Sequence, residues 1–152
     1  MDIVDKKTRS RMMSGIKGKN TQPELIVRKY LHAQGFRFRL HVSNLPGRPD
    51  IVLPKHRLCI FVNGCFWHNH DGCKYATIPE TRHEFWMKKL IANKQRDIQV
   101  KMLLCHTGWR VFELWECGIK DSSSSLDWLT ESIFSDTTML SWPDYICSSD
   151  KL

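Results

Sequence analysis

The residues best suited to bind a metal ion lie in and beyond one short, turn-rich segment. Cys65 and Cys73 flank His68 and His70, and Cys117 lies far along the chain. Thiolates and imidazoles are ligands that zinc prefers, and a structural zinc site takes four of them. The spacing predicts a zinc site built on the three cysteines, with either histidine as the fourth ligand. Buried thiols without a metal are the alternative.

A second chemical possibility combines Asp50 with His68. Asp50 opens a predicted strand, and His68 lies in the segment just described. In a basic protein this pairing suits phosphodiester hydrolysis, because Mg²⁺ binds carboxylates and substrate phosphate while an imidazole exchanges a proton near neutral pH. The alternative makes Asp50 a turn residue after Arg48 and Pro49, and His68 a zinc ligand or a bystander.

Two adjacent aromatic residues, Phe66 and Trp67, lie between turn-forming residues, where both cannot easily face a core. Exposed apolar side chains of this kind can insert between the base pairs of DNA. Packing around the predicted zinc site is the alternative. Trp86, near the start of a predicted long helix, is available to join them, although its position alone favours burial in the core.

The composition indicates one globular domain with a basic surface. The chain has 152 residues and a net charge of +7, while 41% of its residues are hydrophobic. A chain of this length can bury an ordinary core, so the excess positive charge lies on the surface. Nucleic acid is the partner that such a surface favours, and an acidic protein or a membrane surface is the lesser alternative.

The sequence predicts a cytoplasmic protein with no membrane partner. No apolar run approaches the roughly 20 residues that span a bilayer, and residues 1–10 are too polar for a signal peptide. In a reducing compartment six cysteines indicate metal ligands or buried thiols rather than disulfides. Cys59 and Cys105, which have apolar neighbours, are predicted core residues.

The first element that must position these residues is a helix with clear end signals. Thr21 is placed as its N-cap, Pro23 lies in its first turn, and Gly35 ends it. Glu24 lies three residues after the cap, where it can be the reciprocal partner of a capping box. On local evidence alone this structural role is sufficient for Glu24.

The rest of the pattern predicts four strands and two more helices. The strands cover 36–42, 50–53, 57–62 and 109–115, and the helices cover 81–106 and 126–134. The longer helix carries an apolar stripe of Trp86, Leu90, Ile98 and Met102. A strand, a long helix and a strand in succession favour a right-handed crossover and a parallel pair. We therefore predict an α/β fold with a mixed central sheet flanked by helices.

The N-terminal segment differs in character from this body. Six lysines and arginines surround three apolar residues over 5–19. The pattern is that of a basic amphipathic segment, either a solvated helix face or an arm that contacts phosphates. We predict that residues 1–20 form a DNA-contacting arm and that 21–152 form a single nuclease domain, in which 119–152 are peripheral.

Several motifs, taken in order, resemble the very-short-patch-repair (Vsr) family of DNA mismatch endonucleases. They are Leu45-Pro46-Gly47-Arg48-Pro49-Asp50, then Asn63-Gly64-Cys65-Phe66-Trp67-His68 with His70, then Thr81-Arg82 with Glu84-Phe85-Trp86, then Gly108-Trp109-Arg110-Val111, and Trp115-Glu116-Cys117. Thr8-Arg9-Ser10 followed by Met13 matches as well. The resemblance runs from about residue 5 to residue 117.

The resemblance implies a restriction-endonuclease-like fold with one structural zinc site. It also implies a Mg²⁺-dependent enzyme that nicks one DNA strand 5′ to the thymine of a T:G mismatch, the product of 5-methylcytosine deamination. The implied partner is double-stranded DNA that contains such a mismatch, in the nucleoid of a bacterial cytoplasm. A mismatch-repair protein is a candidate second partner, and the enzyme is expected to be a monomer.

Carried over by position, the resemblance implies catalytic roles for several residues. Asp50 matches the carboxylate that binds Mg²⁺, Val62 offers its main-chain carbonyl to the same ion, and His68 matches the catalytic histidine. Glu24 matches a glutamate that supports the water at that ion, a role beyond capping.

The resemblance also implies zinc ligands and DNA contacts. The matched zinc ligands are Cys65, His70, Cys73 and Cys117. The residues that match side chains inserted beside the mismatch are Phe66, Trp67 and Trp86, together with Met13 from the N-terminal arm.

The chain departs from the family pattern in three places. The strand over 58–62 lacks the Glu-x-Lys of many restriction-like nucleases, and the resemblance implies that His68 takes over. Asn63 stands where the family has a histidine, and asparagine can hydrogen-bond a phosphate or a water but cannot carry a proton at neutral pH. We therefore expect Asn63 to be a supporting residue that does not act as a catalytic acid or base. The loop between His70 and Cys73 is one residue longer, which should shift it without removing a ligand.

Two other functions fit part of this pattern. A restriction-type nicking endonuclease acting on paired sequence would use the same metal site with different recognition. A non-catalytic, zinc-dependent DNA-binding module would leave Asp50 and His68 with structural roles only. The clustering of Asp50, His68 and the aromatic pair in the order of the family that the chain resembles speaks against the binding module, since simple binding needs no such set.

Overall fold

The computed structural model describes residues 20–121 and 125–144, so the predicted N-terminal arm, including Met13, lies outside the described residues apart from Asn20. The centre of the fold is a five-stranded sheet in the order β1-β2-β3-β4-β5. Its strands are β1 Arg39–Leu40, β2 Ile51–Leu53, β3 Leu58–Asn63, β4 Arg110–Trp115 and β5 Met139–Trp142. A short 3-10 turn, Pro54–His56, joins β2 to β3.

The directions of the strands confirm the predicted mixed α/β sheet. The β1–β2 and β2–β3 pairs are antiparallel, while the β3–β4 and β4–β5 pairs are parallel. The long helix α3, His83–His106, makes the crossover between β3 and β4. In the resulting register Leu58 pairs with Arg110 and Asn63 with Trp115, so both strands end at the same edge of the sheet.

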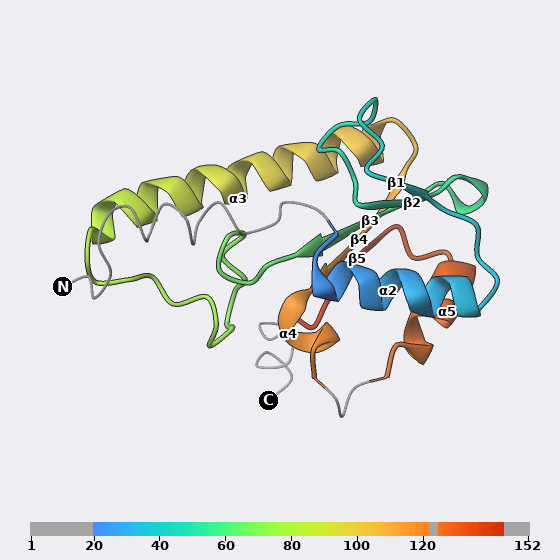
Figure 1. Ribbon diagram of the computed structural model, residues 1–152. Helices are drawn as coiled ribbons and strands as arrows, with labels where there is room; N and C mark the ends of the chain where they lie inside the picture. The colour runs from blue at the N-terminus through green and yellow to red at the C-terminus, as the bar shows by residue number, and fades with distance from the viewer. Residues whose placement is uncertain (1–19, 122–124, 145–152) are drawn as a thin grey trace, which may run out of the picture.

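The two faces of the sheet are covered differently (Figure 1). On one face α2, Gln22–Ala33, and α5, Asp127–Phe134, pack against side chains of β2, β3 and β4. Val27 and Leu31 from α2 are fully buried in this main core. On the other face α3 contributes Leu104 to a smaller cluster with Cys59 and Val111.

The N-terminal half of α3 extends beyond the sheet, above the loop that follows β3 (Figure 1). The predicted apolar stripe is therefore wrong as a core-facing surface at Ile98 and Met102, although its member Leu90 is buried. Ile98 and Met102 are 45% and 67% exposed, and only Leu90 and Leu104 are buried among the residues of this helix. The helix connects two parallel strands, and its polar side chains face both solvent and the site described below.

The first strand is much shorter than predicted. Only Arg39 and Leu40 pair with β2, and both are exposed at the sheet edge. His41 then adopts a left-handed backbone conformation, with φ of 49°, which ends the strand. Phe36 and Phe38 pack against the main core without pairing. The strand predicted over 36–42 therefore has only two paired residues.

The C-terminal part contains more than the predicted helix. α5 is confirmed, and a fifth strand, β5, pairs in parallel with β4. A short helix, α4 Glu116–Ile119, begins directly after β4 and carries Cys117. No helix in the described part of the chain is long and apolar enough to cross a membrane.

Candidate functional site

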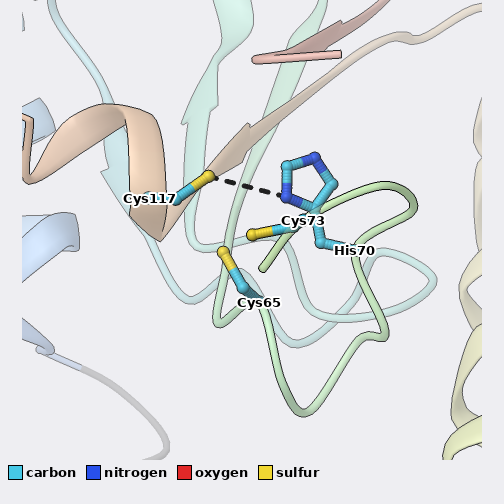
Figure 2. A group of neighbouring side chains, drawn as sticks. All are labelled: Cys65, His70, Cys73 and Cys117. Atoms are coloured by element: carbon cyan, nitrogen blue, oxygen red, sulfur yellow. Dashed lines mark hydrogen bonds between the residues drawn. The ribbon is translucent and has the colours of Figure 1, made fainter. Parts of the chain in front are cut away.

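Four potential metal ligands converge at the edge of the sheet where β3 and β4 end (Figure 2). Cys65, His70 and Cys73 lie on the loop after β3, and Cys117 lies on α4. Their ligand atoms are all within 4.8 Å of one another. Three sulfur atoms and one imidazole form a donor set that fits tetrahedral zinc. The structure thus brings together the four residues that were predicted as zinc ligands.

The ring of His70 is oriented by two further contacts. Its Nε2 lies 2.8 Å from the carbonyl oxygen of Pro143, which can only accept, so Nε2 carries the proton and donates. The opposite nitrogen, Nδ1, then presents a lone pair and lies 3.6 Å from Cys117 Sγ. The ring also stacks on Trp115 with centroids 4.0 Å apart. A backbone carbonyl behind a ligand histidine is the usual outer-shell arrangement of a metal site.

Burial favours the uncharged forms of two of these ligands. It lowers the pKa of the His70 imidazole, which keeps the ring in the neutral form that binds metals. It also raises the pKa of the Cys65 thiol, an effect to which the neighbouring Cys117 and Cys73 contribute. A cation is the group that would reverse the effect on the thiols, because it stabilises thiolates directly.

Asp50 lies at the start of β2, on the other side of β3. Its Oδ2 accepts a hydrogen bond of 2.8 Å from the backbone N–H of Val62. Burial, followed by the nearby charge and hydrogen bond of Glu24, raises the pKa of Asp50 to about 7, against the effect of the Val62 N–H. Two carboxylates this close repel each other when both are ionised, so one of them retains its proton to a higher pH unless a cation lies between them.

Glu24 is the second carboxylate, and it is 1% exposed. It accepts a 3.0 Å hydrogen bond from the backbone N–H of Asn20 and contacts Arg28. The predicted capping box is only half formed. Thr21 Oγ accepts from the N–H of Glu24 at 3.4 Å, but the Glu24 carboxylate reaches back to Asn20 instead of Thr21. Its remaining contacts point toward Asp50 and His41.

His41 completes this cluster, and the sequence did not suggest it. Its Nε2 lies 3.1 Å from Glu24 Oε2, and its backbone N–H donates to the carbonyl of Asp50 at 3.1 Å. One donor atom from each of Glu24, His41 and Asp50 lies within 4.8 Å of the other two. A histidine after an exposed edge strand gives no local signal of this position.

His68 does not join the zinc ligands, although its spacing allowed that. Its Nδ1 lies 2.6 Å from Oδ2 of Asp97, a residue of α3. Asp97 was not predicted to have a role, yet it is the one acidic residue between Glu84 and Glu113. A single carboxylate in the middle of a basic helix was therefore an available signal.

Asn63 is 5% exposed, and its side chain is held by Glu113 of β4, which in turn pairs with Lys101 of α3. Its Nδ2 donates to Glu113 Oε2 at 3.0 Å, and Lys101 donates to Glu113 Oε1 at 2.6 Å. β3 itself carries no charged residue, so α3 and β4 supply an ammonium and a carboxylate beside its end. No pattern in the sequence indicated that Lys101 and Glu113 would meet.

Two cavities adjoin His68. A cavity of about 620 Å³ is lined by Val62, Asn63, His68 and the start of α2. A smaller one, of about 280 Å³, is lined by His68, Asp97, Lys101 and Glu113. His68 therefore lies between the two cavities, with the Asp50 cluster and the zinc-type cluster on either side of β3.

The predicted aromatic residues form a cluster next to the larger cavity. Phe66, Trp67 and Trp86 contact one another edge-on, with ring centroids 5.1 to 5.9 Å apart. All three are half-buried, and none belongs to either hydrophobic core. Core burial of Trp86, which its position alone favoured, is therefore wrong. The Lys89 ammonium lies 5.5 Å from the ring centroid of Trp67 and 5.6 Å from that of Trp86.

Comparison with known proteins places this arrangement in context. The sequence profile of a family described as "DNA mismatch endonuclease Vsr" matches residues 1–74. The type II nicking enzyme V.XorIIP of Xanthomonas oryzae pv. oryzae is 45% identical over 120 residues, which cover 79% of this chain and 88% of that protein.

Two further relatives match a similar share of the chain. The type II nicking enzyme V.NmeAIP of Neisseria meningitidis is 40% identical over 122 residues, which cover 80% of this chain and 86% of that protein. The DNA mismatch endonuclease Vsr of Escherichia coli K12 is 40% identical over 126 residues, which cover 83% and 80%.

Proposed function

This chain belongs to the Vsr family of DNA mismatch endonucleases, and we propose that it nicks one strand of duplex DNA 5′ to the thymine of a T:G mismatch, with Mg²⁺ as its catalytic cofactor. It is an endodeoxyribonuclease by family. One observation supports the specific proposal most. The carboxylates of Glu24, which is buried, and Asp50, which is partly buried, lie near a histidine that is itself held by an aspartate.

The residues around Asp50 fit a divalent cation. Glu24 and Asp50 are a buried and a partly buried carboxylate with donor atoms within 4.8 Å, and burial, followed by repulsion from Glu24, raises the pKa of Asp50. A cation bound between them would remove that repulsion. We assign Mg²⁺ binding to Asp50 and to the main-chain carbonyl of Val62, with Glu24 holding the nearby water. When bound, Mg²⁺ polarises the scissile phosphate and stabilises developing negative charge.

His68 is assigned the proton transfer from the attacking water. Asp97 accepts the Nδ1 proton, at 2.6 Å, which leaves a lone pair on Nε2 for the water. This role for an aspartate behind a histidine is that of an orienting group. Asn63 cannot take over the transfer, because its amide does not titrate. Glu113 fixes the amide so that its oxygen is available to a phosphate or a water.

The cluster of Cys65, His70, Cys73 and Cys117 is assigned a structural zinc ion. A closed set of four ligands would join the irregular loop after β3 to α4, and so hold His68 and the aromatic residues in place. We expect Cys117→Ala to lose the zinc and to fold poorly, because buried thiols would then have no cation. Cys59→Ala, a matched change of a core thiol, should retain one zinc per chain by atomic absorption.

Recognition is assigned to the aromatic cluster and the basic N-terminal arm. Phe66, Trp67 and Trp86 would insert beside the mismatch, together with Met13 from the N-terminal arm, residues 1–20. The remaining residues, 21–152, form one restriction-endonuclease-like domain in this proposal, and the enzyme acts as a monomer. A mismatch-repair protein is a candidate partner for it.

The decisive experiment uses two labelled duplexes that differ only by a T:G pair in place of C:G, within a methylated-cytosine sequence context. We expect a nick next to the mismatched thymine, in Mg²⁺ but not without it, and none in the matched duplex. Asp50→Ala should abolish this nick while leaving zinc content and DNA binding intact. Normal nicking by folded Asp50→Ala protein would contradict the assignment.

A second candidate function follows from the names of the relatives. Several are called type II nicking enzymes, whereas the Escherichia coli protein is called a mismatch endonuclease. Equal nicking of both duplexes would therefore indicate a restriction-type enzyme that acts on paired sequence. Binding without nicking, across several sequence contexts, would indicate the DNA-binding module.

A further inference from the structure

One nitrogen of Arg28 is surrounded by acceptors that usually bind a cation. Its Nη2 contacts Glu24 Oε2, lies 2.9 Å from His41 Nε2 and lies 2.6 Å from Asn20 Oδ1. A guanidinium can only donate hydrogen bonds, so Nε2 of His41 faces it with a lone pair. The place between Glu24 and His41 is therefore built to hold positive charge.

The guanidinium is incompletely satisfied in that place. Arg28 Nε is buried and has no hydrogen-bond partner among the described residues. A buried donor without an acceptor costs free energy, of the order of 1–3 kcal/mol. The Arg28 side chain is 16% exposed, so its end can swing into solvent without disturbing the main core. Its present position is therefore one that a stronger cation could take over.

The donor atoms that Arg28 would leave form a mixed set. Glu24, His41 and Asp50 supply two carboxylate oxygens and one imidazole nitrogen within 4.8 Å of one another. Mg²⁺ prefers oxygen ligands and keeps several waters. Divalent first-row transition ions also bind sites that mix nitrogen with oxygen, with affinities that rise along the series from Mn²⁺. His41 thus changes which ions the set suits.

We propose that His41 is a further protein ligand of the cation that Asp50 binds beside Glu24, that Arg28 occupies the place until a divalent ion arrives, and that the site consequently takes a transition ion of the Mn²⁺ type more tightly than Mg²⁺. The proposal deepens the nuclease function proposed above, on which it rests in taking Asp50 as a metal ligand. It adds His41 and Arg28, and with them a choice of metal.

The test measures Mn²⁺ binding to the zinc-loaded protein without DNA, by the loss of the free Mn²⁺ signal in electron paramagnetic resonance. Mn²⁺ favours oxygen and nitrogen donors over thiolates, so the zinc site does not interfere. His41→Asn removes the imidazole but tolerates the left-handed backbone, which asparagine adopts readily. His32→Asn, a change of an exposed histidine on α2, is the matched control.

We expect His41→Asn to weaken Mn²⁺ binding about tenfold or more, since even the loss of a group behind a ligand typically costs 10- to 100-fold. Mg²⁺ binding, measured by competition, should change by less than about threefold, because Mg²⁺ makes little use of nitrogen. Arg28→Met should strengthen Mn²⁺ binding, because it removes the competing cation. His32→Asn should behave as the wild type.

Two results would overturn the proposal. Unchanged Mn²⁺ affinity in folded His41→Asn protein would show that His41 is no ligand. Weaker Mn²⁺ binding in Arg28→Met protein would show that Arg28 positions Glu24 instead of occupying the cation's place. Nicking of the T:G duplex is scored separately. If the wild-type protein nicks the T:G duplex, either of these two results refutes this inference alone. If Mn²⁺ binding depends on His41 but the wild-type protein does not nick the duplex, the proposed function alone is refuted.

Discussion

His68 owes its orientation to Asp97, which approaches from α3 while His68 lies on the loop after β3. We predict that Asp97→Asn lowers the nicking rate by about 10²- to 10⁴-fold. The amide would donate to Nδ1 and force the proton onto Nε2, so the lone pair that accepts the water's proton would be lost. Single-turnover nicking at saturating enzyme measures this effect, and affinity for the mismatched duplex should stay within about twofold.

The control for Asp97 is Asp71→Asn, which removes an exposed carboxylate that pairs with Lys94 nearby. It lies outside the proposed proton path and should nick normally. If Asp97→Asn were as active as Asp71→Asn, Asp97 would serve only to hold the loop against α3.

Asp50 is costly to the stability of the protein without Mg²⁺. Burial and Glu24 raise the pKa of Asp50 from 3.8 to about 7, so the unfolded chain ionises first. Between pH 4 and pH 7 the folded state binds more protons, and its stability therefore falls as the pH rises. Above pH 7 the whole cost is present. A buried carboxylate with this behaviour is typical of a site selected for function.

We predict that Asp50→Asn stabilises the zinc-loaded, Mg²⁺-free protein, more at pH 8 than at pH 5. The gain at pH 8 should reach up to about 4 kcal/mol, since one pKa unit corresponds to about 1.4 kcal/mol. Asparagine can still accept from Val62 and donate to Glu24. Urea unfolding at both pH values measures it, with Asp127→Asn on α5 as an exposed control. Equal effects at the two pH values would contradict the assigned cause.

At the scale of elements, the turn before Asp50 is fixed by its contact with α3. Gly47 has φ of +73°, and a Cβ at this position would overlap the side chain of Val100. We predict that Gly47→Ala destabilises the protein by about 2–4 kcal/mol, from a left-handed backbone and an overpacked contact together. Displacement of Asp50 should also slow nicking, which separates this turn from a purely structural one.

Gly35 provides a matched comparison for Gly47. Its φ of +83° is similar, but a Cβ there would meet nothing within 4 Å. Gly35→Ala should therefore cost only the backbone strain, about 1–2 kcal/mol. In the Gly47→Ala background, Val100→Ala should recover part of the stability. If both glycine variants unfolded at the same urea concentration, contact with α3 would play no part.

The elements differ in how far the sequence could predict them. α2, α5 and the β3–α3–β4 crossover follow from end signals and periodicity, which are local. β1 is shorter than predicted because the turn at His41 depends on its hydrogen bond to Asp50. β5 was not predicted because Met139–Trp142 forms a strand only through its pairing with β4. The apolar stripe of α3 was misplaced because periodicity cannot show where a helix leaves its sheet.

The candidate site likewise contains residues that the sequence could predict and residues that it could not. The zinc-type ligands could be predicted, because three of them are close in sequence and all four have a distinctive chemistry. His41 and Arg28 could not, since they meet each other from positions 13 residues apart along the chain. Asp97 stood out as a single carboxylate among basic residues, but its partner His68, 29 residues away, could not be foreseen. Their positions depend on the packing of α2, α3 and the β1–β2 turn.

For the whole molecule, charge and the aromatic cluster should govern different parts of DNA binding. The net charge of +7 gives affinity for any duplex, which falls steeply with salt as phosphate contacts replace counterions. Phe66, Trp67 and Trp86 carry no charge, and their half-buried rings can stack only where a base step opens, which a mismatch makes easier. The two contributions can therefore be separated experimentally.

We predict that Trp67→Ala reduces the preference for T:G over C:G duplex by about fivefold or more, since stacking on an aromatic ring contributes about 1–3 kcal/mol per base. The slope of log affinity against log salt should not change, because no charge is lost. Lys89→Gln should show the reverse, a slope smaller by about 0.9 if its ammonium binds one phosphate. Filter binding at several salt concentrations measures both. If Trp67→Ala weakened both duplexes equally, the rings would pack the loop after β3 and mismatch recognition would lie elsewhere.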